Sequence, residues 1–143
     1  MSTVRELHDK AVNLAQLALV AREKGDSEKA EALAIEAYEY ESQAADLVSN
    51  EEQSEPTLSI LYSSAASLAY QGRKFDVALQ LVAKGLSGYP PPQVKEELKA
   101  LIEQCIRKVK GKRKAEGKRK DLLPSYTPDP RRIKREHAEG TSD

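Results

Sequence analysis

Apolar residues recur at steps of three and four through most of the chain, which is the spacing of one face of a helix. Between residues 4 and 21 such a face comprises Val4, Leu7, Ala11, Leu14, Ala18 and Ala21. Gly25 interrupts the pattern, and Asp26 or Ser27 can cap a second helix that runs roughly from Ser27 to Val48. The two helices are expected to form an antiparallel hairpin.

A second hairpin is expected after a polar linker at residues 49–55. Pro56 suits the first turn of a third helix, where its missing N–H costs nothing. A fourth helix should run from Phe75 to Tyr89, where three consecutive prolines stop it. A fifth begins near Pro92, and its apolar stripe is Val94, Leu98, Leu101, Cys105 and Val109.

The helical pattern fails beyond Gly111, and the charge changes sign. Residues 1–106 carry ten Lys and Arg against seventeen Asp and Glu, whereas residues 107–143 carry thirteen against six. The overall net charge of zero therefore hides an acidic body and a basic tail. Low apolar content and like-charge repulsion predict that residues 111–143 are a largely disordered, flexible basic tail after a helical domain at residues 1–110.

The two hairpins follow one plan. Gly25, Ala30 and Ala37 in the first correspond to Gly72, Ala78 and Gly85 in the second, at offsets of 47, 48 and 48 residues. The offset of 47 predicts one additional residue in the second turn. The matching small and apolar positions are Leu14, Leu17, Ala18, Ala21, Gly25, Ala30, Ala34 and Ala37, then Leu61, Ala65, Leu68, Gly72, Phe75, Ala78, Val82, Gly85 and Pro90.

This arrangement resembles the tetratricopeptide repeat, although the interval is longer than the usual ~34 residues. The segments at residues 55–58, 64–69 and 85–91 look like those of small bacterial tetratricopeptide-like proteins. The resemblance implies an all-α fold of two hairpins with a C-terminal covering helix. It also implies a scaffold that binds a partner protein on its helical surface.

Candidate partner-binding residues follow from the resemblance and from side-chain chemistry. Many tetratricopeptide proteins hold peptide termini with Asn and Lys or Arg on the first helix of a repeat, and Asn13 matches that position. Tyr40 and Tyr70 are candidates for partner contact or for packing, because tyrosine joins a rigid apolar ring to a polar tip. Tyr38 and Tyr62 are expected mainly to pack between helices.

The basic tail is a candidate site for RNA, DNA or another polyanion, with an acidic protein surface or no partner as alternatives. Its cations can neutralise phosphates and release counterions. Weak sequence selectivity is expected, because one tyrosine is available for base stacking. The candidates are Arg107, Lys108, Lys110, Lys112, Arg113, Lys114, Lys118, Arg119, Lys120, Tyr126, Arg131, Arg132, Lys134 and Arg135.

Enzyme chemistry is not indicated, and no catalytic, cofactor or metal site is expected. Neither His8 nor His137 has a Cys or a second His close in the sequence, and Cys105 lies on an apolar stripe as a small hydrophobic residue. The carboxylates of the second helix are expected mostly on solvated faces; they are Glu28, Glu31, Glu36, Glu39 and Glu41.

The expected location is the cytoplasm, away from membranes. No apolar stretch approaches the ~18–20 residues of a membrane span. Cys105 is the one cysteine, and no secretory segment precedes the first helix.

Three hypotheses of function remain open. The first is an adaptor that binds a protein through its helices and a nucleic acid or another component through its tail. The second is an RNA- or DNA-binding accessory protein that acts mainly through the tail. The third is a self-assembling structural protein, a homo-oligomer.

Overall fold

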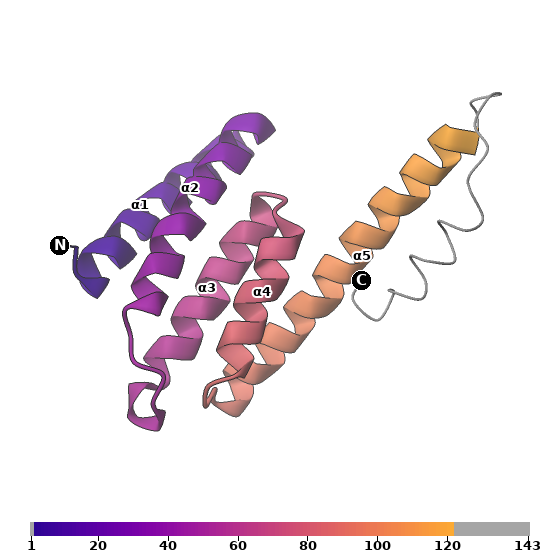
Figure 1. The fold of residues 1–143 in the computed structure, drawn as a ribbon. Coiled ribbons are helices and arrows are strands. Elements are labelled where there is room, and N and C mark those ends of the chain that lie inside the picture. Colours follow the sequence, from indigo (N-terminus) through magenta and orange to yellow (C-terminus); the bar gives the residue numbers. More distant parts are fainter. Residues whose placement is uncertain (1, 122–143) are drawn as a thin grey trace. The chain divides into compact units, whose positions relative to one another are not determined.

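The computed structural model describes the backbone of residues 2–121 and the side chains of residues 2–111. This part of the chain is all-helical, as predicted. Met1–Val109 form one compact unit, called the helical body below. The helices are α1 (Val4–Glu23), α2 (Ser27–Asp46), the short 3-10 helix η1 (Glu52–Ser54), α3 (Thr57–Gln71), α4 (Phe75–Leu86) and α5 (Pro92–Asp121) (Figure 1).

Helices α1 and α2 form the first antiparallel hairpin of the body, and α3 and α4 form the second (Figure 1). Helix α2 packs against α3 and so joins the hairpins. Asp26 is the N-cap of α2, and its carboxylate accepts the Lys29 N–H at 3.2 Å. Both ends of α4 and the start of α5 agree with the sequence pattern to within three residues.

Helix α5 extends to Asp121 and corrects the predicted helix end at Lys110. Residues 112–121 consist mostly of Lys, Arg, Ala and Glu, which have high helix propensity and offset the cost of the glycines. The rest of the predicted tail, residues 122–143, lies outside the described residues.

The turns of the two hairpins have the same backbone geometry at a constant interval. Gly25 has φ +81° and Arg73 has φ +62°, so both residues adopt the left-handed conformation, 48 positions apart. This corrects the prediction of an additional residue in the second turn. Gly25 and Gly72 are not structural equivalents, because the left-handed position of the second turn holds an arginine.

Backbone hydrogen bonds confirm this equivalence of the turns. The Asp26 N–H donates to the Ala21 carbonyl at 2.9 Å, and the Lys74 N–H donates to the Ala69 carbonyl at 2.9 Å. Each bond accompanies a shorter-range bond from the left-handed residue, to Arg22 in the first turn and to Tyr70 in the second. This pattern is the Schellman motif, which satisfies carbonyl groups at a helix end.

Gly72 has a different role from Gly25, namely close contact between helices. A Cβ atom at residue 72 would lie 2.6 Å from Ile35 Cγ1 and 3.3 Å from the Ile35 nitrogen. Real Cβ atoms essentially never approach another atom so closely. The end of α3 can therefore approach α2 only without a side chain at this position.

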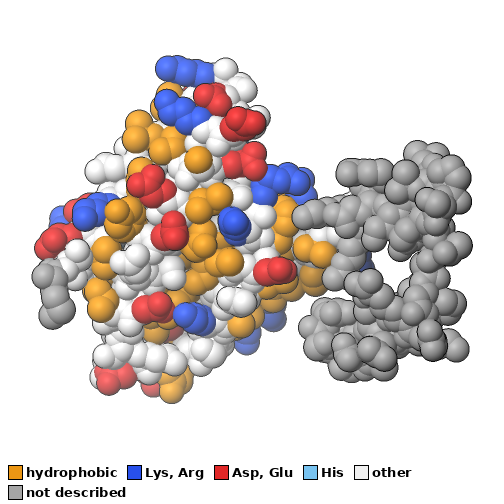
Figure 2. Space-filling view, turned by 45° about the horizontal axis from the view of Figure 1, so that its top comes forward, with side chains coloured by type: hydrophobic (Ala, Val, Ile, Leu, Met, Phe, Trp, Pro, Cys, Tyr) orange, Lys and Arg blue, Asp and Glu red, His pale blue; other side chains and the backbone are white. Residues whose placement is uncertain are grey.

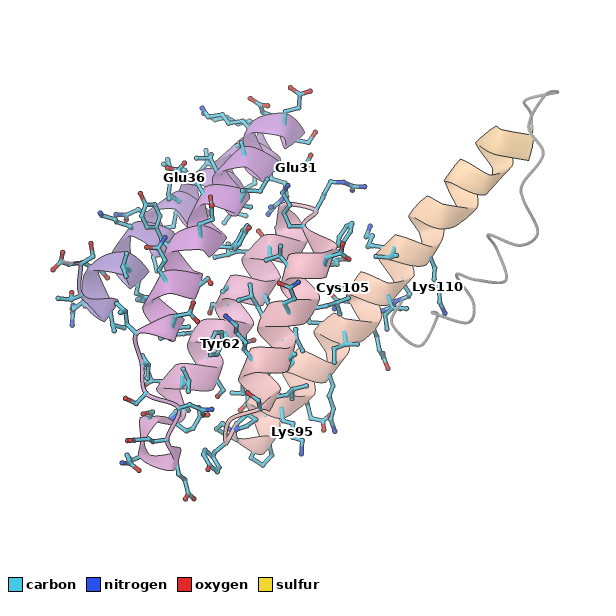
Figure 3. All side chains as sticks on the ribbon, viewed as in Figure 1. Glu31, Glu36, Tyr62, Lys95, Cys105 and Lys110 are labelled. Carbon is cyan, nitrogen blue, oxygen red and sulfur yellow. The ribbon has the colours of Figure 1, made fainter. Side chains whose placement is uncertain are left out.

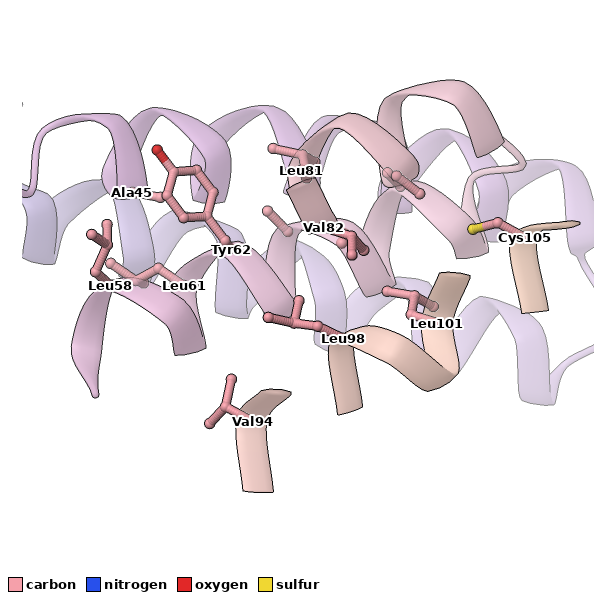
Figure 4. Close-up of a cluster of buried hydrophobic side chains, with 14 residues drawn as sticks. Ala45, Leu58, Leu61, Tyr62, Leu81, Val82, Val94, Leu98, Leu101 and Cys105 are labelled. Atoms are coloured by element: carbon pink, nitrogen blue, oxygen red, sulfur yellow. The ribbon is translucent and has the colours of Figure 1, made fainter. Parts of the chain in front are cut away.

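Most of the large buried apolar side chains belong to the second hairpin and to α5 (Figure 4), and Leu7 on α1 is an exception. Leu98 and Cys105, on α5, are fully buried, and Val82, on α4, is almost completely buried. Helix α5 thus covers the second hairpin, as expected. In the first hairpin the fully or almost fully buried residues are mainly alanines, which let α1 and α2 approach closely; they are Ala11, Ala18, Ala30, Ala34, Ala37, Ala44 and Ala45.

We predict that the left-handed position of each turn responds oppositely to substitution. Gly25→Arg should lower the free energy of unfolding by about 1 kcal/mol, because a residue with a Cβ is strained there. Arg73→Gly removes the same strain and should leave stability unchanged within about 0.5 kcal/mol or raise it, since the exposed contacts of Arg73 are weak. Urea denaturation measures both effects, and a marked loss of stability in Arg73→Gly would contradict the proposed equivalence.

We also predict that Gly72→Ala destabilises the body by about 1–3 kcal/mol through overpacking against Ile35. Ile35→Ala makes room for the new methyl group. The double variant should therefore lose less stability than the sum of the two single changes. Strict additivity in the denaturation midpoints would exclude a direct clash.

Candidate partner-binding groove

A groove runs along α1 and α3 and consists of two adjoining cavities of about 550 and 640 Å³. His8 lines both cavities and lies where they meet. The first is lined by His8, Ala11, Val12, Ala15, Gln16, Leu19, Glu41, Ser63, Ser64, Ser67, Leu68 and Glu97, and the second by Val4, Arg5, His8, Asp9, Thr57, Ile60 and Leu61. We call both together the α1–α3 groove.

Small side chains keep the groove open, and apolar side chains border it. Ala11 and Ala15 lie four positions apart on α1, and Ser63 and Ser64 lie four and three positions before Ser67 on α3, so each set shares one helix face. Large apolar groups remain exposed in the lining, with Leu19 51% and Ile60 45% accessible. The groove therefore offers apolar contact area that no described part of the chain covers.

A buried carboxylate lies in this groove. The side chain of Glu41, on α2, is only 3% exposed, and its Oε1 lies 2.8 Å from His8 Nδ1. Burial raises the pKa of the Glu41 carboxyl, and the hydrogen bond from His8 opposes that rise. The pair corrects one expectation, since the Glu41 side chain is not on a solvated face.

The position of Glu41 in the sequence already indicates that its side chain is buried, although its charge suggests a solvated position. Glu41 lies four positions after Ala37 and four before Ala45, both fully buried, so it is in register with the inner stripe of α2. A charged residue on such a stripe needs a polar partner in the folded state. No sequence spacing identifies His8 as that partner, because the two residues are 33 positions apart.

The charged groups of the groove are mainly acidic. Asp9, Glu41 and Glu97 line it, and Arg5 is the one Lys or Arg in the described lining. The face shown in Figure 2 mixes acidic and basic side chains among hydrophobic ones and has no block of one sign. A ligand with positive charge and an apolar side matches the groove.

The residues predicted from sequence to bind a partner are absent from the lining of the groove. Asn13 is exposed on α1. Tyr40 is half-buried, with the Lys10 ammonium 5.4 Å from its ring centroid. Tyr70 packs edge-on against Phe75, with ring centroids 5.6 Å apart.

The two tyrosines expected to pack do so. Tyr38 and Tyr62 contact the core, and Tyr62 is itself buried. The Tyr62 hydroxyl donates to Asp46 Oδ1 at 2.8 Å. Burial, together with this hydrogen bond and the charge of Asp46, raises the pKa of Tyr62 to about 12.

Three of the predicted basic candidates have described side chains. Arg107, Lys108 and Lys110 are exposed on α5. The remaining candidates, from Lys112 to Arg135, lie outside the residues whose side chains are described.

Other reactive groups do not gather into a centre in the described part of the chain. No three His, Cys, Asp or Glu side chains there could hold a metal ion together. Burial raises the pKa of the Cys105 thiol, which disfavours the reactive thiolate. Among the helices described, none combines the length and apolarity of a membrane span.

Comparisons of the chain with protein-family models, with curated proteins and with solved structures give no match.

We predict that Glu41→Gln stabilises the body at pH 7. Because the folded-state pKa of Glu41 is raised, wild-type stability falls as pH increases from the ordinary value of 4.5 through the folded pKa. Glutamine keeps a hydrogen-bonding group beside His8, and because it does not ionise, it does not lose stability as pH rises. Denaturation midpoints should therefore separate progressively as pH rises above 4.5.

Glu36→Gln is the matched control, since Glu36 is exposed on the same helix (Figure 3). Its difference from wild type should remain small and vary little with pH. A Glu41→Gln variant that is less stable than wild type at pH 7 would refute the burial argument.

Proposed function

We propose that the chain is a non-enzymatic adaptor of the tetratricopeptide-like kind. In this proposal a segment of a partner protein occupies the α1–α3 groove. The basic residues between Arg107 and Arg135 contact a nucleic acid or another component of the same assembly. One chain then raises the effective concentration of one partner near the other.

The observation that carries the protein-binding half is the open, apolar character of the groove. Ala11, Ala15 and the three serines leave room for side chains from outside, and Leu19 and Ile60 present exposed apolar surface. Segments that dock between helices typically insert apolar side chains at helical spacing into such a groove.

The charge of the groove defines the segment further. Glu97 and Asp9 lie at its two cavities, and the Glu41 carboxylate is buried beside His8. A cationic side chain from the partner would offset negative charge that the groove itself does not neutralise. The proposed occupant is therefore an amphipathic, basic segment of a partner protein.

The same geometry favours binding over catalysis. Ser63, Ser64 and Ser67 share the groove with His8, which suggests the parts of a hydrolytic site. The hydrogen bond of the His8 imidazole goes to Glu41, and no serine hydroxyl in the described residues bonds to the ring. A histidine must contact a serine hydroxyl to activate it as a nucleophile.

The groove can be tested with a synthetic 14-residue peptide that places Leu at helical spacing and Lys elsewhere. We predict chemical-shift changes on titration at α1 and α3 residues of the groove. Ser64→Arg should lower peptide affinity at least tenfold, because it fills the groove and adds repulsive charge. A peptide with Glu in place of Lys should bind much more weakly.

Two arginine substitutions outside the groove serve as controls. Gln80→Arg adds the same charge at an exposed position on α4 and should not change affinity. Asn13→Arg separates the groove from the site expected from the family resemblance. Loss of peptide binding in Asn13→Arg with retention in Ser64→Arg would reject the groove, and shifts caused by self-association at high concentration would favour the homo-oligomer.

A further inference from the structure

A separate, smaller cavity of about 300 Å³, called the turn-side cavity below, lies beside the turn of the second hairpin. It shares no residue with the α1–α3 groove. Each of the five α-helices contributes at least one residue to its lining, and the turn between α3 and α4 contributes Arg73. All of these residues belong to the helical body. Figure 3 places Glu31, one of the lining residues, on α2 near this turn. The lining residues are Arg22, Glu31, Tyr70, Gln71, Arg73, Phe75 and Lys108.

Positive charge exceeds negative charge in this turn-side cavity. Arg22, Arg73 and Lys108 face one carboxylate, that of Glu31. The Arg73 Nε lies 3.8 Å from Glu31 Oε1, at the limit of an ion pair, and both side chains are solvent-accessible. Arg22 donates a hydrogen bond to the neutral amide of Gln71 at 3.0 Å. The lining of the cavity therefore has a net positive charge, although the net charge of the helical body is negative.

Arg73 is held in this lining at a conformational cost. Its φ of +62° is left-handed, a conformation that the first turn reserves for Gly25. A non-glycine residue in that region costs of order 1–3 kcal/mol, and such strain concentrates at functional sites. The second turn thus has an arginine where folding alone favours glycine.

Two aromatic rings complete the cavity. The Arg73 guanidinium carbon lies 5.7 Å from the centroid of Phe75, and Tyr70 contacts Phe75 edge-on. Cations beside aromatic rings are the combination with which proteins bind single-stranded nucleic acids, because cations contact phosphates and rings stack on bases. The small volume suits one nucleotide unit better than a rigid duplex.

We propose that the turn-side cavity binds single-stranded nucleic acid. Arg22, Arg73 and Lys108 contact backbone phosphate, and a base lies against the surface of Phe75 and Tyr70. The site shares Lys108 with the basic residues proposed above, but none of its residues belongs to the α1–α3 groove or to residues 110–143. The helical body then selects single strands, in addition to any charge contact made by the tail.

The test uses the full-length chain and a fluorescent oligothymidine of about 15 nucleotides, followed by anisotropy at several salt concentrations. Arg73→Gly and Lys108→Gln should each lower affinity about fivefold. Each should also reduce the slope of log affinity against log salt by about 0.7, the value for one lost phosphate contact on a single strand. Arg73→Gly is informative because it should not weaken folding, so reduced binding cannot be attributed to an unfolded variant.

Lys95→Gln is the matched control, since it removes the same charge at an exposed position near the start of α5 (Figure 3). Its affinity and salt slope should equal those of wild type. A loss equal to that of Lys108→Gln would show general charge attraction and overturn the proposal.

Photo-crosslinking locates the contact independently of affinity. An oligonucleotide that contains 5-bromouracil is irradiated together with the wild-type chain, and mass spectrometry then identifies the cross-linked peptides. The peptide that contains Tyr70 or Phe75 should carry the cross-link. Cross-links confined to residues 110–143 would leave nucleic-acid binding to the tail and overturn the cavity. No binding of any oligonucleotide would overturn both nucleic-acid sites, while the peptide experiment on the groove would still stand.

Discussion

Close approach of helix backbones is the constraint on which the rest of the body depends. Most of the buried apolar residues of α1 and α2 are alanines, and Gly72 lets the end of α3 approach Ile35 without a side chain between them. Helices this close bury little volume per residue, so the chain needs α5 to supply Leu98, Leu101 and Cys105 to the core. Other small residues, mainly Ala15 and the serines of α3, leave an open groove between α1 and α3.

Much of this architecture could be predicted from the sequence because helix periodicity and turn residues are local signals. The existence, order and type of all five α-helices follow from residues only a few positions apart, and the same local signals narrow the cap of α2 to Asp26 or Ser27. The end of α5 was not predictable in the same way. An apolar stripe marks where a helix is packed, and a helix of Lys, Arg, Ala and Glu can continue after packing ends.

The details that required coordinates all involve residues distant in the sequence. A comparison of residue types pairs Gly25 of the first turn with Gly72 of the second. The backbone geometry shows instead that Gly25 corresponds to Arg73. The pairing of His8 with Glu41 depends on how α1 lies against α2, which no local pattern specifies. The groove and the turn-side cavity are likewise products of helix packing, because residues from several helices line each of them. The sequence alone offers only single prominent residues as candidates for partner contact, such as Asn13 and Tyr40.

The uneven distribution of large core residues has a consequence for motion. The second hairpin and α5 contain most of the buried leucines and Val82, whereas the buried residues of α1 and α2 are mainly alanines. Less apolar area is released into water when the first hairpin opens, so its amide hydrogens should exchange with solvent sooner than those of α3 and α4. Separation of α1 from α3 would widen the groove between them. The least stable part of the body is thus one wall of its proposed docking surface, and an incoming segment would meet a wall that can adjust its width.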